Sequence, residues 1–356
     1  MQNPFTTTFS KIPANTYIPT EQEQEIIENF SYDEPSESVY KITGVRGSGK
    51  TVLLAKVEEE FASDDNRKKG WCVYRLSPSR DMLIQLAAYM DKEGLVKRKK
   101  NSKSVNISAS VLGSGGGIGL STTNNNDIFD IGIEIDDMLQ EFQKKDKRIL
   151  VGVDEVSKTP EMIVFASEFG KWIRAGYPIY LVCTGLYENI EQLYNVNNLT
   201  FFRRATTIKT EPLNEVRMVN TYRKNLDVDM ELAKEMASDT KGYPYAFQQM
   251  GVLYFKKSES EDYIDVIFDL KTELYAYSYE KIWEELTIED RALVSILSND
   301  DELKREDILN KMEKPNNYSV YRDRLLKRGI IKSRQGYISL ALPYFGEYIK
   351  EYHSEG

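Results

Sequence analysis

The sequence predicts an α/β fold: a core with a parallel sheet and a P-loop, then a helical lid, then a C-terminal winged helix-turn-helix. Three observations carry this prediction. A phosphate-loop pattern at 44–51 lies between a strand-like and a helix-like run, and strand-like runs alternate with helix-like runs up to residue 210. Residues 280–356 then follow the order helix, helix, helix, hairpin. We therefore expect three domains, at 1–210, 211–279 and 280–356.

Residues 1–20 are rich in proline and threonine and predict an extended arm, which is followed by a helix at 21–30. An arm just upstream of a phosphate loop is well placed to wrap a nucleotide base. Ile18 and Pro19 are its candidate apolar contacts. The alternative, a plain lead-in segment, stays open.

The phosphate loop reads Gly44-Val45-Arg46-Gly47-Ser48-Gly49-Lys50-Thr51 and continues into a helix at Val52. The pattern G-x-x-x-x-G-K-T between a strand and a helix is typical of a nucleotide-binding P-loop. Its glycines let the backbone turn its N–H groups towards a phosphate, and the positive end of the helix faces the same anion. We expect Lys50 to reach the β- and γ-phosphates and the Thr51 hydroxyl to bind Mg²⁺. The flanking runs disfavour the alternative, a chance glycine-rich turn.

A buried strand at 71–76 and a helix at 81–90 continue the alternation. An insert follows at 97–127, in which a glycine-rich tip joins two alternating runs that predict a β-hairpin. The insert opens with five basic residues in the seven positions 97–103. This basic run is a candidate contact for DNA or another acidic partner; a solvated loop is the alternative.

An apolar strand that begins at 148, after a helix at 128–143, ends in Asp154 and Glu155. In this position Asp154 would hold Mg²⁺, directly or through water, and Glu155 would act as the base or the orienter for the attacking water. An Asp-Glu pair after a strand is weak evidence alone and becomes strong beside a P-loop. We expect the two loops at the ends of neighbouring strands, with a triphosphate and its metal between them.

After a helix at 162–174, a strand at 177–185 carries Thr184 near its end, where a hydroxyl can sense the γ-phosphate. The alternative is that Thr184 serves only the turn at the end of the strand. Arg203 and Arg204 precede a short strand, and arginine suits a finger that pairs with phosphate oxygens in trans. A surface arginine pair is an equal alternative, and the sequence does not decide which arginine would act.

The segment 211–279 predicts a helical lid. One helical run extends from 213 to about 255 and is interrupted at 240–245, where Pro244 takes the first turn of a new helix. Another helix follows at 263–279. Pro244 is a candidate nucleotide contact because of a family resemblance of the Gly-x-Pro element that contains it.

The C-terminal segment predicts helices at 288–297, 305–312, 317–328 and 343–352, with a hairpin at 330–340. Residues 314–334 contain seven basic residues and one acidic residue. A positive patch on a winged helix fits phosphate contacts beside a major groove. Winged helices also dock proteins, so a DNA partner and a protein partner both stay open.

Composition narrows the function classes. The net charge is −9, so any surface for nucleic acid must be local. Cys72 and Cys183 lie in apolar runs and suggest buried reduced thiols, and the single histidine, His353, excludes histidine catalysis and histidine-rich metal sites. The first residues do not resemble a secretory signal, and apolar runs stay short of the roughly 18–20 residues of a membrane span. We expect a cytoplasmic protein without membrane contact.

These features together resemble the AAA+ superfamily, in particular the origin-recognition-like and signalling ATPases of bacteria and archaea. The opening stretch 3–9 also looks like the lead segment of a bacterial group of such ATPases. The resemblance implies that 44–51 is Walker A and 149–155 is Walker B. It further implies that Thr184 is sensor 1, that Arg203 or Arg204 is the finger, and that the ligands are ATP or ADP and Mg²⁺.

The lid departs from the general pattern of this superfamily. Gly242-Tyr243-Pro244 stands where sensor 2 usually carries an arginine. It is similar to the G-x-P element of signal-transducing ATPases, in which the proline lies near the base. This implies a switch that holds nucleotide and moves slowly between states, rather than a constitutive motor.

Two functions remain in competition. In one, an ATP-driven switch controls DNA binding by the winged helix, as in a replication initiator. In the other, the same switch serves signalling or defence and the winged helix docks a protein or locks against the core. A homo-oligomeric ring and a monomeric switch are both open. A GTPase is disfavoured because no N-K-x-D motif follows the Asp-Glu strand, and the three-part layout disfavours a small-molecule kinase.

Overall fold

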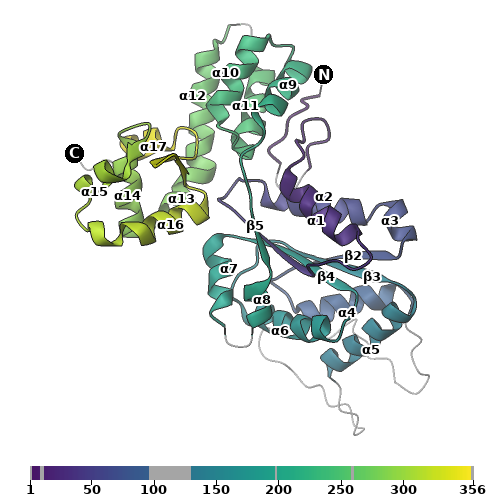
Figure 1. Cartoon of the computed structure of the whole chain (residues 1–356). Coiled ribbons are helices and arrows are strands. Elements are labelled where there is room, and N and C mark those ends of the chain that lie inside the picture. The colour runs from purple at the N-terminus through teal and green to yellow at the C-terminus, as the bar shows by residue number, and fades with distance from the viewer. Residues whose placement is uncertain (1, 9–11, 96–129, 197–198, 258–259, 354–356) are drawn as a thin grey trace, which may run out of the picture.

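The structure, a computed structural model, describes residues 2–8, 12–95, 130–196, 199–257 and 260–353. The predicted insert at 97–127, with its basic run and hairpin, lies outside these residues. A sheet-containing core carries the helical lid at one end, and the C-terminal domain lies beside the lid (Figure 1).

The core sheet is parallel throughout and has the strand order β2-β3-β4-β1-β5. Its strands are β1 (Val39–Thr43), β2 (Trp71–Leu76), β3 (Arg148–Val153), β4 (Ile179–Gly185) and β5 (Thr206–Lys209). The expectation that the P-loop strand and the acidic strand are neighbours is wrong, because β4 pairs with both and separates them. Parallel strands still end at one edge, so both loops and the end of β4 meet there.

Helices cover both faces of the core sheet (Figure 1). The core helices are α1 (Glu21–Ser31), α2 (Lys50–Phe61), α3 (Asp64–Lys68), α4 (Met82–Lys92), α5 (Ile131–Lys144), α6 (Pro160–Arg174), α7 (Tyr187–Tyr194) and α8 (Thr200–Arg204). Adjacent strand residues serve opposite layers: Leu150 packs with α1 and α2, whereas Val151 packs with α4, α5 and α6. Strands that are buried on both faces explain the continuous apolar runs of the sequence.

The lid consists of α9 (Glu215–Leu226), α10 (Met230–Thr240), α11 (Pro244–Lys256) and α12 (Tyr263–Leu274). The sequence treats 213–240 as one helix, but α9 ends at Asp227, which takes a left-handed conformation (φ 53°). The N-terminal arm packs against this lid. Phe5 is buried there against Tyr222 and Phe247.

A continuous helical rod joins the lid to the C-terminal domain. α12 passes into the π-helical segment η1 (Tyr275–Tyr279) and then into α13 (Glu280–Glu284). The boundary predicted between 279 and 280 therefore falls inside a helix. Buried residues of the lid and the C-terminal domain also form one hydrophobic cluster, from Phe5 to Ile349, so the two parts share a core.

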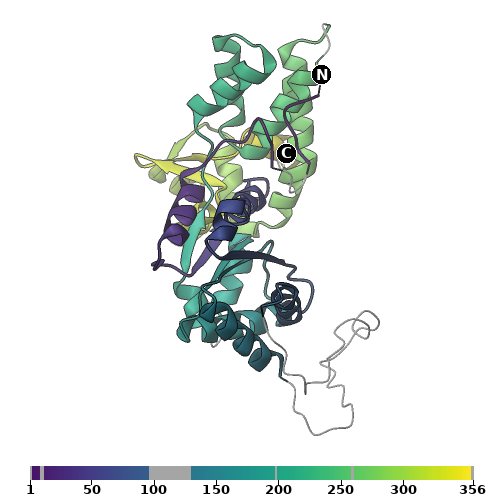
Figure 2. The same cartoon turned by 90° about the vertical axis from the view of Figure 1, so that its right-hand side faces the viewer.

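The C-terminal domain has the predicted order of three helices, a hairpin and a last helix. Its elements are α14 (Ile288–Ser298), β6 (Leu303–Lys304), α15 (Arg305–Lys311), η2 (Pro315–Asn317), α16 (Tyr318–Arg328), β7 (Ile331–Arg334), β8 (Tyr337–Leu340) and α17 (Phe345–His353). Gly329 ends α16 with φ 81°. The β7–β8 hairpin projects sideways from the molecule (Figure 2).

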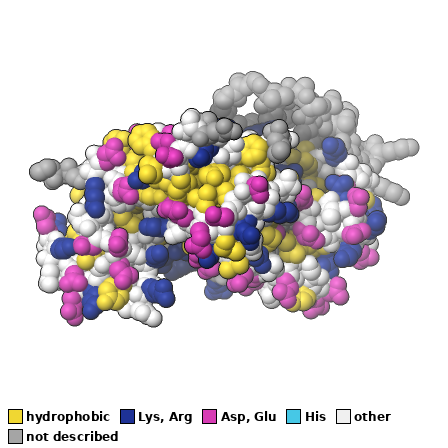
Figure 3. Space-filling view, turned by 90° about the horizontal axis from the view of Figure 1, so that it is seen from above, with side chains coloured by type: hydrophobic (Ala, Val, Ile, Leu, Met, Phe, Trp, Pro, Cys, Tyr) yellow, Lys and Arg dark blue, Asp and Glu magenta, His cyan; other side chains and the backbone are white. Residues whose placement is uncertain are grey.

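None of the helices in the described part of the chain combines the length and apolarity that a membrane crossing requires. Seen from above, the face in Figure 3 mixes acidic and basic side chains around a central apolar area.

Candidate functional site

The phosphate loop has the conformation that an anion site needs. Gly47 and Gly49 have φ values of 76° and 86°, a region that side chains with a Cβ rarely occupy. α2 begins at Lys50 without a side-chain cap, so its first N–H groups remain available for an anion. The Lys50 Nζ donates to the carbonyls of Gly44 and Val45, both at 3.0 Å. Burial, together with nearby Arg46, lowers the pKa of Lys50 to about 8.

Thr51 and Asp154 lie in direct contact, as the sequence predicts for a shared metal. The Thr51 hydroxyl is 3.1 and 3.0 Å from the two carboxylate oxygens of Asp154. A hydroxyl and a carboxylate are hard oxygen ligands of the kind that Mg²⁺ prefers, and Mg²⁺ usually takes few protein ligands beside phosphates. The donor set therefore fits a nucleotide-bound magnesium ion.

Thr184 holds the acidic turn together. Its side chain is fully buried and its hydroxyl donates to Asp154 Oδ1. The hydroxyl oxygen of Thr184 in turn accepts from the backbone N–H of Glu155 at 3.0 Å. Glu155 takes a left-handed conformation (φ 55°) and is exposed. Strained backbone of this kind persists where the surroundings fix it, and it is common at active sites. Thr184 therefore contacts the two acids and does not line the cavity in front of them.

A cavity of about 370 Å³ opens between the P-loop, the lid and the N-terminal arm. Its lining includes most of the predicted nucleotide contacts: Ile18, Arg46, Gly47, Ser48, Gly49, Lys50, Thr51, Val52, Glu155 and Pro244. The predicted metal ligand Asp154 is not part of the lining, and neither are two of the predicted nucleotide contacts, Pro19 and Gly44. Pro19 is exposed and offers its carbonyl to Arg217 at 2.8 Å, and Gly44 lies at the base of the loop against Thr210.

The arm and the lid meet at Gln248 on α11. The Gln248 side chain accepts from the Thr6 N–H and the Thr16 hydroxyl and donates to the Thr16 carbonyl, each at 3.1 Å. Pro244, at the start of the same helix, comes close to Gly49: a Cβ there would lie 3.6 Å from the proline ring. The cavity is thus bounded by the loop, the arm and the first turn of α11.

Arg203 and Arg204 lie apart from this cavity. Both are exposed at the end of α8, and neither lines the cavity. An arginine finger that acts on a second copy must be exposed, but an arginine pair without a function is exposed as well. Exposure therefore does not distinguish the two interpretations. The finger therefore stays a prediction.

Tyr243, which was not among the predicted site residues, connects the P-loop to the helical rod. Its buried hydroxyl donates to the Arg46 carbonyl and lies 2.8 Å from the hydroxyl of Ser278 in η1. A Cβ at Gly47 would lie 2.2 Å from this hydroxyl, so the loop must carry glycine there. The only signal was the position of Tyr243 inside the Gly-Tyr-Pro element.

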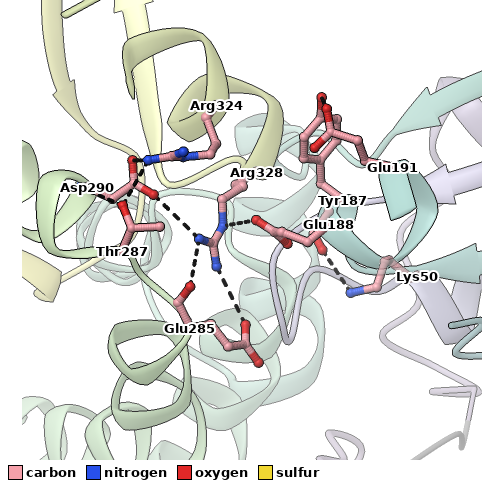
Figure 4. A network of polar contacts seen from close by, with 10 residues as sticks. Lys50, Tyr187, Glu188, Glu191, Glu285, Thr287, Asp290, Arg324 and Arg328 are labelled. Carbon is pink, nitrogen blue, oxygen red and sulfur yellow. Dashed lines mark hydrogen bonds and ion pairs between the residues drawn. The ribbon is translucent and has the colours of Figure 1, made fainter. Parts of the chain in front are cut away.

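Two of the predicted basic residues of the C-terminal domain are used inside the protein (Figure 4). Arg324 binds the buried Asp290 at 2.7 Å, and Arg328 is 6% exposed and binds Glu188 of α7 at 2.6 Å. Lys314, Lys332 and Arg334 are exposed, and Arg322 is half-buried. The basic surface that remains is smaller than the sequence suggested.

The chain is similar to solved P-loop ATPases over nearly its whole length. A Walker-type ATPase of Pyrococcus abyssi aligns over 96% of this chain and 98% of that chain, with a TM-score of 0.62 and 14% identity. The ORC2 protein of Aeropyrum pernix, in ADPNP–ADP complexes, aligns over 94% and 95%, with a TM-score of 0.53 and 10% identity. These likenesses confirm the predicted fold, a parallel-sheet core followed by helical parts, and at such identities they show the fold alone.

A sequence family described as a domain of unknown function (DUF8462) matches residues 276–349. This span covers the end of the helical rod and most of the C-terminal domain. No curated protein matches the sequence.

Proposed function

We propose that this protein binds ATP with Mg²⁺ between core, arm and lid, hydrolyses it slowly, and uses the nucleotide state to control its C-terminal domain. The observation that supports this most is the single cavity bounded by Lys50, Thr51 and Glu155, with the Thr51–Asp154 contact at its back. Lysine, hydroxyl and two carboxylates around one phosphate-sized loop fit phosphoryl transfer to water.

Each residue has a distinct task in this scheme. Lys50 and the N–H groups of the loop neutralise the β- and γ-phosphates, and Thr51 and Asp154 would hold Mg²⁺, which supplies further positive charge. Glu155 accepts a proton from the attacking water. Thr184 touches no reacting atom and is a positioning residue that holds the Asp154 carboxylate and the backbone of Glu155 in place.

Slow turnover is supported by the charge of the cavity wall. Among the described residues that line it, the cations are Arg46 and Lys50, and the first turn of α11 contributes Pro244 and Tyr245 instead of an arginine. Without a lid cation, less charge is stabilised in the transition state. A phosphate-release assay on the full chain tests this: release should be slow and should need Mg²⁺. Absence of any release would remove hydrolysis from the proposal.

For the output of the switch we propose DNA contact through exposed cations of the hairpin and the segment before α16, together with the half-buried Arg322 of α16. Lys314, Arg322, Lys332 and Arg334 remain available there. Binding to a DNA mixture should weaken steeply with salt, and replacing Arg322 and Arg334 together by alanine should reduce the salt dependence. The particle mass with and without ATP and DNA then separates a ring, a monomer and a DNA complex.

A protein partner is the second candidate, and the docked position of α16 favours it. Arg328 and Leu326 of this helix contact Glu188 and Lys209 of the core, so part of the predicted recognition helix already serves a protein contact. Insensitivity of all binding to salt and to the Arg322 and Arg334 changes would select this candidate and remove the DNA proposal.

A further inference from the structure

Two ion pairs connect the core to the C-terminal domain and the end of the rod. Arg328, in the last turn of α16, places its Nε 2.6 Å from Glu188 Oε1 of α7. Arg46 of the P-loop places its Nη2 3.6 Å from Glu285 Oε1, just beyond α13. The core contributes the carboxylate to the first pair and the guanidinium to the second. Together they fasten α16 to the core beside the phosphate loop.

The two pairs are linked through the C-terminal side. Arg328 also donates to the Glu285 carbonyl at 3.2 Å and lies 3.7 Å from its carboxylate (Figure 4). Asp290 is 4.0 Å from Arg328 and binds Arg324 on its other side. Glu285 and Glu188 both contact Arg328, and Glu285 also pairs with Arg46. If Arg46 leaves, the two carboxylates share Arg328 alone. Like charges at an interface weaken it, so docking depends on Arg46.

Arg46 is placed to exchange partners. It lines the nucleotide cavity and also the small gap under Arg328, between Glu188 and Glu285. Its Nε is buried and has no hydrogen-bond partner among the described residues. A buried donor without a partner is costly, so an anion that satisfies it would be favoured. Phosphate is such an anion, because guanidinium donors match its oxygens.

The backbone of Arg46 is fixed while its side chain is less constrained. The Tyr243 hydroxyl donates to the Arg46 carbonyl and is itself held by Ser278. The Arg46 side chain is 38% exposed, and the ion pair with Glu285 is longer than a close hydrogen bond. These contacts hold the backbone of Arg46 and leave its side chain able to rotate from one partner to another.

We propose that Arg46 carries the nucleotide state to the C-terminal domain by leaving Glu285 for the terminal phosphate of a bound nucleoside triphosphate. This rests on the proposed ATP binding and adds the residue and the contact through which it acts. ADP carries less charge at the end of the site where Lys50 and Arg46 lie, so it competes less with Glu285. The triphosphate weakens the docking of α16, and the diphosphate leaves it in place.

Distances between two spin labels test this in the full chain. Asp65→Cys on α3 and Ser319→Cys on α16 are exposed sites for labels, and the native Cys72 and Cys183 are buried. Pulsed double-resonance measurements would be made without nucleotide, with ADP, and with Mg²⁺ and a non-hydrolysable ATP analogue. We expect the docked population to fall about fivefold with the analogue, the scale of one partly exposed ion pair, and to stay unchanged with ADP.

The same distances measured in the labelled Glu285→Gln variant decide whether Arg46 transmits the signal. It should lower the docked population without nucleotide, and the analogue should cause no further change. Glu284→Gln is the matched control: Glu284 is exposed, pairs with Lys281 on its own helix at 2.7 Å, and should leave the nucleotide response intact. A general weakening of the rod would affect both variants alike.

Calorimetry on the same samples separates the possible failures. If the analogue binds but neither it nor Glu285→Gln changes the distances, the exchange by Arg46 is wrong and ATP binding stands. If the analogue does not bind, the proposed function is wrong and this inference is wrong with it. A response to the analogue that persists in Glu285→Gln would also overturn the role of Arg46.

Discussion

The phosphate loop and the basic stretch of the C-terminal domain were both predicted from short patterns, and the structure treats them differently. Nearly all predicted residues of the loop line one cavity. In the basic stretch, Arg324 and Arg328 bind Asp290 and Glu188 within the protein, whereas Arg322 and Arg334 remain accessible. The difference arises because the phosphate loop is determined by neighbouring residues, whereas the surroundings of each arginine depend on residues far away in the sequence.

A phosphate loop is a local structure. Its glycines and the start of α2 fix the geometry within eight residues, whatever the rest of the chain does. A charge count has no geometry of its own. Whether an arginine meets solvent or a buried carboxylate is decided by residues such as Glu188, far away in the sequence. The predictions below test each side of this contrast.

Replacing Lys50 by alanine should have the largest effect. The buried ammonium group lies where the β- and γ-phosphates are expected, so ATP affinity should fall about a thousandfold, equivalent to about 4 kcal/mol. Calorimetric titration measures this. Lys68→Ala, on an exposed lysine of α3, should bind like the wild type. Equal affinity in both variants would refute the P-loop assignment.

Glu155→Gln should retain ATP and slow its turnover by about a hundredfold or more, because a glutamine cannot accept the proton of the attacking water. A phosphate-release assay under saturating ATP measures it. Glu161→Gln, on the exposed first turn of α6, serves as control. A fully active Glu155 variant would remove this residue from the catalytic step.

Arg328→Ala should destabilise the protein by about 3 kcal/mol, because it removes a buried guanidinium and leaves the half-buried Glu188 without its cation. Arg322→Ala should stay within about 0.5 kcal/mol. Denaturant unfolding compares the two. Similar losses in both variants would contradict the contrast between arginines that are paired within the protein and arginines that are accessible.

A pH-dependent effect is expected for Lys41, which is fully buried on β1 and donates to the Phe202 carbonyl at 2.6 Å. Burial lowers the pKa of Lys41 from 10.5 to about 8. Between these values the unfolded chain binds more protons than the folded chain, so Lys41 makes the free energy of unfolding rise with pH. The slope is at most about 1.4 kcal/mol per pH unit.

The measurement is the difference between the wild type and Lys41→Met in unfolding experiments from pH 8 to 10. The difference isolates Lys41 from tyrosines and cysteines that titrate in the same range. The wild type should gain stability relative to the variant as the pH rises. A constant difference would show that Lys41 keeps its ordinary pKa.

Periodicity predicted most helices and strands of the described chain, because amphipathic runs and buried strands leave direct marks in the sequence. It did not predict that β4 lies between β1 and β3, since strand order depends on how the connections cross the sheet. It also missed the end of α9 at Asp227, where a non-glycine residue takes a left-handed conformation.

In the candidate site, too, residues that belong to a local pattern were predictable and residues placed by tertiary contacts were not. The P-loop, Asp154 and Glu155 were predictable because their spacing encodes their chemistry. Pro19 and Thr184 were assigned to the nucleotide from position alone, and the structure places one on the surface and the other behind the acids. Tyr243, Ser278 and Glu285 connect the loop to the rod through tertiary contacts only, so no local pattern indicated them.

The most direct test of the account is a crystal structure of the protein with Mg²⁺ and a non-hydrolysable ATP analogue. The account predicts the triphosphate in the cavity between P-loop, arm and lid, with Lys50 at its β- and γ-phosphates and the metal at Thr51 and Asp154. A nucleotide bound elsewhere, or a phosphate loop that stays empty at saturating analogue, would contradict it.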